Sequence, residues 1–178
     1  MRLYQIDDVL FMRKNKGIFV YNETDEKIGF ISLIDMPKCE KRHAFSFNPE
    51  TGAPTRMGIK KRGIKNILTA TYIVESSKEH FTLKDKPGNS LLYFCVEGII
   101  NEQTIRIEEN WNKELEIKVN NEHVALVKQH EWTLKTNIQI GDSIKESSVL
   151  FSVIIFSLFF YKIYNDETDF IENILGEF

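Results

Sequence analysis

Most of the chain alternates apolar and polar residues over short segments, with the period of a β-strand that buries one face. The clearest case is 114–119, where leucine, isoleucine and valine alternate with glutamate and lysine. Comparable segments recur up to residue 140, at 3–6, 9–14, 18–22, 27–34, 66–75, 80–84, 90–97, 104–109, 123–128 and 133–140. Their number and spacing predict a sandwich or barrel of about ten to twelve strands.

Turn-forming residues separate many of these segments. Asn22–Glu26 and Asp85–Asn89 carry the asparagine, aspartate, proline and glycine residues that tight turns require. Asn120-Asn121 lies between two alternating segments, and asparagine tolerates positive φ, so we expect a tight hairpin there. No strand–helix–strand alternation is present, which argues against a parallel sheet.

Residues 36–57 depart from this pattern. Three prolines and a glycine fall within them, at Pro37, Pro49, Pro54 and Gly52. Proline cannot donate a hydrogen bond to a neighbouring strand, so the segment is interpreted as a long loop. We expect at most one short strand inside it, at His43–Phe47.

The run Val149–Tyr164 is the long apolar segment of the chain, and it is apolar on every side of a helix. Such a helix must be surrounded by protein or by lipid. Ser147 or Ser148 can cap its start, and the charges that begin at Asp166 mark its emergence into water. The sequence therefore predicts a buried helix over about 147–164, followed by a short terminal helical turn at Phe170–Leu175.

A membrane anchor is the main alternative for this run, and a helix packed against an open sheet is a further one. A helix needs about 20 apolar residues to cross a bilayer, and Lys162 interrupts the run before that length is reached. A closed sheet around the helix also supplies a partner for the many β-branched and aromatic residues upstream. We therefore favour a closed antiparallel β-barrel of about twelve strands around a central C-terminal helix, in a single domain spanning 1–178.

Composition limits the function classes. The 178 residues carry a net charge of −3, which argues against a dedicated nucleic-acid binder. Cys39 and Cys95 lack metal-ligand spacing and are interpreted as reduced thiols, with one disulfide as the alternative. The N-terminal segment lacks the apolar core of a signal peptide, so we expect a cytoplasmic protein, peripheral at the membrane in one interpretation.

Three stretches, taken in chain order, resemble the tubby C-terminal-like family, in particular its LURP-one-related and scramblase-like branch. They are the opening hairpins (Tyr4–Ile6, Phe11–Arg13, Ile18–Asn22 and Lys27–Gly29), the late strand His123–Lys128, and the apolar C-terminal helix followed by Asp166-Glu167. The resemblance implies a barrel of about twelve strands wrapped around the helix. It also implies lipid-associated or adaptor functions, without implying one activity.

The strongest candidate for a binding site is a basic cluster that ends near a glycine, formed by Arg56, Lys60, Lys61, Arg62 and Lys65. Lysine and arginine at this density can hold the oxyanions of a phosphate-rich headgroup. Further cations precede the cluster in the irregular segment, at Lys38, Lys41 and Arg42. The alternative is a solvated turn between strands.

Other chemistry finds little support in the sequence. The four histidines are scattered, no catalytic or metal-binding motif is present, and we expect no cofactor, no metal and no enzymatic activity. Trp111 and Trp132 are interpreted as barrel-core residues, with lipid-interface anchors as the alternative. We therefore expect a non-enzymatic module that binds anionic phospholipid or a protein partner at a membrane surface. A structural or regulatory scaffold and a tail-anchored membrane protein remain alternatives.

Overall fold

Each strand of the sheet hydrogen-bonds the strands before and after it in the chain. The computed structural model describes residues 1–7, 17–63, 69–77, 79–86, 93–129 and 135–176. Within these residues the strands are β1 (Arg2–Asp7), β2 (Ile18–Asn22), β3 (Lys27–Leu33), β4 (Cys39–Pro49), β5 (Thr55–Lys60), β6 (Thr71–Ser76), β7 (Glu79–Asp85), β8 (Cys95–Ile100), β9 (Gln103–Glu109), β10 (Leu115–Val119), β11 (Glu122–Gln129) and β12 (Lys135–Ile140).

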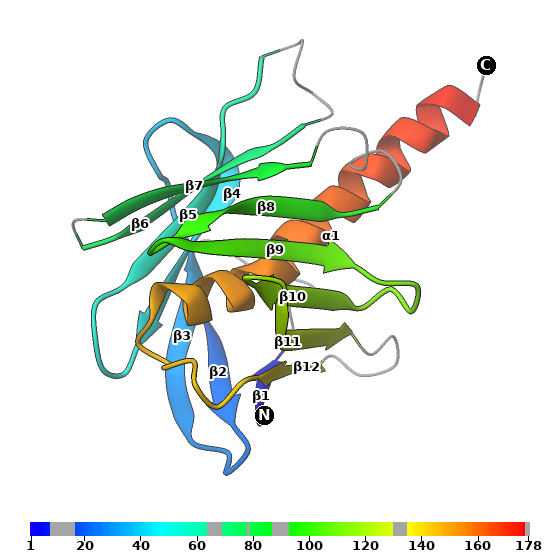
Figure 1. Ribbon diagram of the computed structural model, residues 1–178. Coiled ribbons are helices and arrows are strands. Elements are labelled where there is room, and N and C mark those ends of the chain that lie inside the picture. Colours follow the sequence, from blue (N-terminus) through cyan, green and yellow to red (C-terminus); the bar gives the residue numbers. More distant parts are fainter. Residues whose placement is uncertain (8–16, 64–68, 78, 87–92, 130–134, 177–178) are drawn as a thin grey trace.

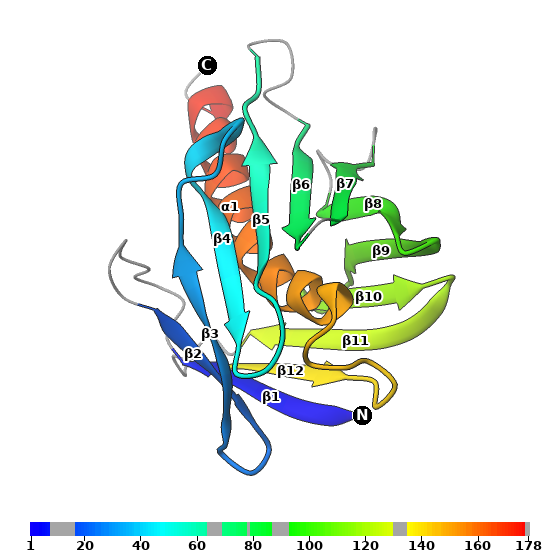
Figure 2. The same ribbon diagram turned by 90° about the vertical axis from the view of Figure 1, so that its left-hand side faces the viewer.

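The sheet closes into a barrel. Neighbouring strands are antiparallel throughout, and β1 pairs with β12 along its whole length. The helix α1 (Val149–Gly176) enters the barrel at one end and leaves it at the other (Figures 1 and 2). The predicted fold, a closed antiparallel barrel of about twelve strands around a C-terminal helix, is therefore confirmed.

The inward faces of the strands supply the wall of the core. On β10, Leu115, Ile117 and Val119 are buried, as the alternation predicted. The hairpin that follows has Asn120 and Asn121 at φ 50° and 68°, the left-handed conformation that asparagine tolerates. The expected tight hairpin is therefore confirmed.

The first half of α1 fills the barrel. Ser148 caps the helix by accepting a hydrogen bond from the Phe151 backbone N–H at 3.1 Å, and nearly every side chain up to Tyr161 is buried. Aromatic rings from the strands pack edge-on against it: Tyr4 lies 5.0 Å from Phe151, and Tyr72 lies 5.1 Å from Phe160, between ring centroids. The two buried serines of the helix donate to its own carbonyls, so the barrel interior needs no other polar partner for them.

The helix is longer than predicted. It continues without a break from Val149 to Gly176, where the sequence indicated an end near Tyr164 and a separate turn at Phe170–Leu175. Charged residues after Tyr164 do not end a helix; they only make it unable to stay inside a core, so the helix continues and projects beyond the barrel (Figure 1).

By length and composition alone, Val149–Ile171 could cross a membrane. However, 67% of its apolar window is buried inside the protein. In this fold the barrel, and not lipid, surrounds the apolar run.

The interpretation of residues 36–57 as a long loop is wrong. The segment contains β4 and the start of β5, joined by a short connection that holds Gly52 at φ 113°. Two features hid β4 in the sequence. Its register shifts between Cys39 and Ala44, where Arg42 has φ 68°, and Pro49 is tolerated because it is the last residue of the strand.

Candidate functional site

The predicted basic cluster does not form one site. Arg56 lies within β5, Lys60 ends that strand, and Lys61 and Arg62 follow it directly. Lys65 lies outside the residues that the structure describes. The described members lie in three different environments.

Arg62 is an internal tie between the sheet and α1. Its guanidinium donates to Glu40 on β4, with Nε at 2.7 Å from Oε1, and to Glu167 on α1, with one terminal nitrogen at 2.9 Å from Oε2. Only 15% of the Arg62 side chain is exposed. Two carboxylates hold this cation in a fork-like arrangement, so it is not available to an external ligand.

The pKa of Glu40 shows the effect of its contact with Arg62. Partial burial raises the pKa of Glu40, but hydrogen bonds from Arg62 and His43 outweigh that effect and lower the pKa below its usual value. Glu40, His43 and Glu167 lie close enough together to suggest a cation site. The guanidinium of Arg62 already contacts both carboxylates, so the cluster is an ion-pair network held by Arg62.

Lys60 and Lys61 belong to a second environment, here called the basic rim, which consists of Lys38, Lys41, Arg42, Lys60 and Lys61. Pairing of Cys39 with Lys60 and a hydrogen bond from the Lys61 N–H to the Lys38 carbonyl (2.9 Å) bring its two segments together. All five side chains are exposed. None of them forms an ion pair or a hydrogen bond within the described part of the chain.

The basic rim sits at the end of the barrel from which α1 emerges. β4 begins and β5 ends there, and the tie from Arg62 to Glu167 joins the same place to the helix. The one nearby carboxylate on β4, Glu40, is already engaged by Arg62 and His43. The positive charge of the basic rim is therefore not cancelled locally, despite the negative net charge of the chain.

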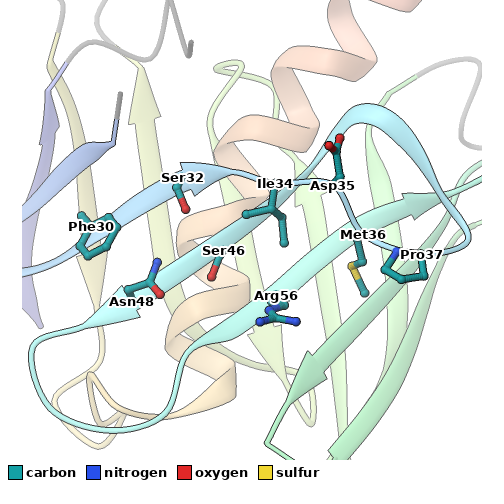
Figure 3. Close-up of a pocket in the computed structure, with 9 residues that line it drawn as sticks. All are labelled: Phe30, Ser32, Ile34, Asp35, Met36, Pro37, Ser46, Asn48 and Arg56. Atoms are coloured by element: carbon teal, nitrogen blue, oxygen red, sulfur yellow. The ribbon is translucent and has the colours of Figure 1, made fainter. Parts of the chain in front are cut away.

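Arg56 occupies a third environment, a cavity on the outer wall of the barrel (Figure 3). The cavity has a volume of about 380 Å³ and is formed by outward residues of β3, β4 and β5 and by the segment after β3. Its lining combines apolar, hydroxyl, amide and charged side chains: Phe30, Ser32, Ile34, Asp35, Met36, Pro37, Ser46, Asn48 and Arg56. We call it the wall cavity.

A second cavity, of about 580 Å³, adjoins Trp111 in the turn between β9 and β10. Trp111 is fully exposed, so its interpretation as a core residue is wrong; Trp132 lies outside the described residues. The turn is well ordered by hydrogen bonds, because Asn110 Oδ1 accepts from the backbone N–H groups of Asn112 (2.8 Å) and Glu114 (3.1 Å). A large aromatic ring is thus presented to solvent on a rigid support.

Sequence reasoning found the cations but not their partners. Glu167 follows Arg62 by 105 positions, and only the path of α1 through the barrel brings the two together. Nothing in the sequence indicated the wall cavity, because Ser32 lay in one predicted strand whereas Asn48 and Arg56 lay in the segment interpreted as a long loop. Cys39 and Cys95 are both buried and form no disulfide with each other.

The fold is a closed antiparallel barrel built around its own C-terminal helix. Where that helix emerges, the side chains of the basic rim have no ion-pair partner among the described residues. No protein-family model matches the sequence. No curated protein matches it either. A solved structure of a protein from Arabidopsis thaliana is similar in fold, with 9% identity, 87% of this chain and 90% of that chain covered, and a TM-score of 0.45. A likeness of this degree carries no argument about function.

Proposed function

We propose that this protein is a non-enzymatic binding module that docks on anionic phospholipid surfaces through the basic rim. The observation that carries the proposal is the group of five exposed cations without carboxylate partners in the described chain. Each lysine or arginine near an anionic membrane contributes about 1 kcal/mol of attraction. Such a module would work at the cytoplasmic side of a membrane, as a peripheral protein.

The arrangement of charge on α1 restricts how the module approaches. Asp166 and Asp169 are exposed where the helix leaves the barrel, and an anionic surface repels them. The orientation with the lowest electrostatic energy therefore brings the β4–β5 side of the rim to the membrane and keeps the helix end away from it. We infer an edge-on contact, not insertion of the helix.

Vesicle sedimentation tests the proposal. The variant Lys60→Glu/Lys61→Glu should bind vesicles that contain phosphatidylserine at least 30-fold more weakly than the parent, because removal of two attractive charges alone costs about 2 kcal/mol. Binding by the parent should weaken as salt rises from 50 to 300 mM. Vesicles of phosphatidylcholine alone should bind neither protein.

A matched control separates the site from net charge. Lys84 and Lys145 are also exposed, lie outside the basic rim, and form no ion pair among the described residues. Lys84→Glu/Lys145→Glu changes the net charge by the same amount as the test variant. If both double variants lose binding equally, the interaction depends on overall charge and the assignment to the rim is wrong.

We also propose that the chain is a distant member of the tubby C-terminal-like family, in its LURP-one-related and scramblase-like branch. The order of the resembling stretches and the architecture of strands around a C-terminal helix support this proposal. An experimental structure tests it: the strands 18–22 and 123–128 should superpose on the equivalent strands of family members in the same barrel order. A different strand order would refute membership.

Trp111 favours a second candidate function, recognition of a protein partner. Tryptophan is enriched among the residues that dominate binding energy at protein interfaces, and here it stands fully exposed beside a cavity. Trp111→Ala should abolish capture of a specific partner from the source cells, whereas Lys60→Glu/Lys61→Glu should retain it. A partner captured equally by both variants would argue against this surface.

A further inference from the structure

The floor of the wall cavity is a row of polar side chains that crosses three strands. Strand register places Ser32 of β3 opposite Ser46 of β4, and Ser46 opposite Arg56 of β5. Directly opposed residues in antiparallel strands have Cβ atoms about 4.5–5.5 Å apart. The two hydroxyl groups and the guanidinium therefore lie side by side across the three strands. Asn48 lies beside this row on β4, opposite Phe30.

Arg56 is available to a ligand in a way that Arg62 is not. Arg56 forms no ion pair and no hydrogen bond with the described residues, although Glu75 lies opposite it on β6. The carboxylate of Glu75 instead has an oxygen 3.6 Å from Nδ1 of His80, a contact that is an ion pair only when the histidine is protonated. The other carboxylate near the cavity belongs to Asp35. It lies at the edge of the cavity and points away from Arg56 (Figure 3).

These groups favour a carboxylate over a more highly charged anion. A guanidinium offers parallel N–H donors that match the two oxygens of a carboxylate, and serine hydroxyls can donate to the same oxygens. Glu75 lies opposite Arg56 on β6, and a negative charge beside the single cation opposes a dianion such as a phosphate monoester more than it opposes a monoanion.

The rest of the cavity is suited to an apolar ligand body. Ile34 and Met36 extend over the same side of the cavity as Arg56, and the ring of Phe30 forms its far wall (Figure 3). Ser46 is only 5% exposed, so its part of the floor is largely shielded from water. The volume, about 380 Å³, lies within the range of small-molecule pockets.

We propose that the wall cavity binds a small organic monocarboxylate, with its carboxylate on Arg56, Ser46 and Ser32 and its apolar body against Ile34, Met36 and Phe30. This site is separate from the basic rim and does not depend on the membrane proposal. The chemistry identifies the ligand class by one negative charge and one compact hydrocarbon or aromatic group.

Titration of the full-length protein by two-dimensional NMR tests the inference, with acetate, butyrate, hexanoate, benzoate and inorganic phosphate as probes. Hexanoate and benzoate should shift the amide signals of Ser32, Ser46 and Arg56. Affinity should rise from acetate to hexanoate by up to about fourfold per methylene, the factor expected for a buried CH₂. Inorganic phosphate should bind at least tenfold more weakly than benzoate at pH 7.5.

Variants assign the roles. Arg56→Gln should weaken benzoate binding at least tenfold, Arg56→Lys should restore part of it, and Ser46→Ala should weaken it about threefold. Glu75→Gln should tighten binding, because it removes the competing carboxylate. Lys60→Glu/Lys61→Glu should leave benzoate binding unchanged, which distinguishes failure of this inference from failure of the membrane proposal.

Several results would overturn the inference. Unchanged affinity in Arg56→Gln, or probe-induced shifts at residues 38–42 and 60–61 in place of the wall cavity, would each contradict it. Phosphate that binds as tightly as benzoate would show a nonspecific anion site. Because Arg56 is exposed on the outer wall, its substitution should leave the circular dichroism spectrum unchanged. An altered spectrum would show that Arg56 has a structural role, and would contradict its assignment as a residue that only binds the ligand.

Discussion

The two halves of α1 belong to one continuous helix but have opposite environments. Val149–Tyr161 is nearly all buried by the barrel, whereas the described side chains after Lys162 are partly or fully exposed, with Phe170 66% exposed. The first half is held by apolar burial from every direction. The second half is held near its beginning by the ion pair between Glu167 and Arg62. One helix thus serves as the core at one end and as a projecting arm at the other.

The largest expected effect is the loss of the whole helix. A chain that ends after Ser147 lacks many buried phenylalanine, isoleucine and leucine side chains, each worth about 2–5 kcal/mol, and this exceeds the usual total stability of a domain. We expect it to be unfolded or insoluble by circular dichroism and thermal melting. A truncated chain that melts cooperatively would show that the barrel stands without its central helix.

The loss of a single phenylalanine should lower the free energy of unfolding by an amount that depends on which half of α1 it occupies. Phe156→Ala removes a fully buried ring and should lower the free energy of unfolding by about 3–5 kcal/mol in urea titration. Phe170→Ala is the matched control on the projecting half and should change it by about 0.5 kcal/mol or less. Similar losses in both variants would remove the distinction between the halves.

Loss of Arg62 should have an intermediate effect. Arg62→Gln leaves Glu40 and Glu167 without their shared cation and should cost about 1–3 kcal/mol, the range for hydrogen bonds to charged groups. Lys27→Gln is the control: it breaks the exposed pair with Glu50 and should cost under about 1 kcal/mol. Urea titration at pH 7 compares the two.

The same variant should alter the response to acid. The folded-state pKa of Glu40 is lower than its usual value of 4.5, so its contribution to stability is present above that pH and is lost as the pH falls below it. Chemical denaturation between pH 7 and pH 3 should show this loss in the parent and a smaller loss in Arg62→Gln. An identical pH dependence in both proteins would exclude Glu40 as its source.

The smallest effect is expected from shortening the projecting arm. A chain that ends at Thr168 keeps Glu167 and removes Phe170 and the exposed residues around it. Its free energy of unfolding should stay within about 0.5 kcal/mol of the parent. A larger loss, measured by urea titration, would mean that the arm packs on the barrel more than its exposure indicates.

The fold was predictable where the local preference of the residues matches the structure that they adopt in the barrel. Leu115–Val119 alternates with the period of the sheet, Asn120 and Asn121 take the positive φ that their hairpin needs, and the apolar run from Val149 can only be a surrounded helix. Each of these features is decided by residues adjacent in the chain, so a single sequence was enough to identify them.

Strands β4 and β5 show where that reasoning fails. At Gly58 an added Cβ would lie 2.8 Å from the Ala44 Cβ and 2.9 Å from the Cys39 sulfur. The glycine therefore allows two segments to pack closely on the outer wall. Such a requirement depends on neighbours across the sheet, which local propensity does not show.

The candidate sites were predictable only as a set of charges. The sequence indicated that Arg56, Lys60, Lys61 and Arg62 are close together, but strand alternation and the path of α1 decide which face each one takes. Arg62 turned inward, Lys60 and Lys61 joined the basic rim, and Arg56 entered the wall cavity. Sequence proximity therefore identified the cations without identifying their roles.

The position of α1 after all twelve strands has a consequence for biosynthesis. Synthesis proceeds from the N-terminus, so the ribosome makes every strand of the barrel before the segment that fills it. Pairing of Arg2 with Ile140 also requires nearly the whole sheet to be present. The nascent chain must therefore carry its inward-facing apolar residues without their partner until α1 emerges. Folding is then a late, cooperative event that follows synthesis, and molecular chaperones are the natural protection during the interval.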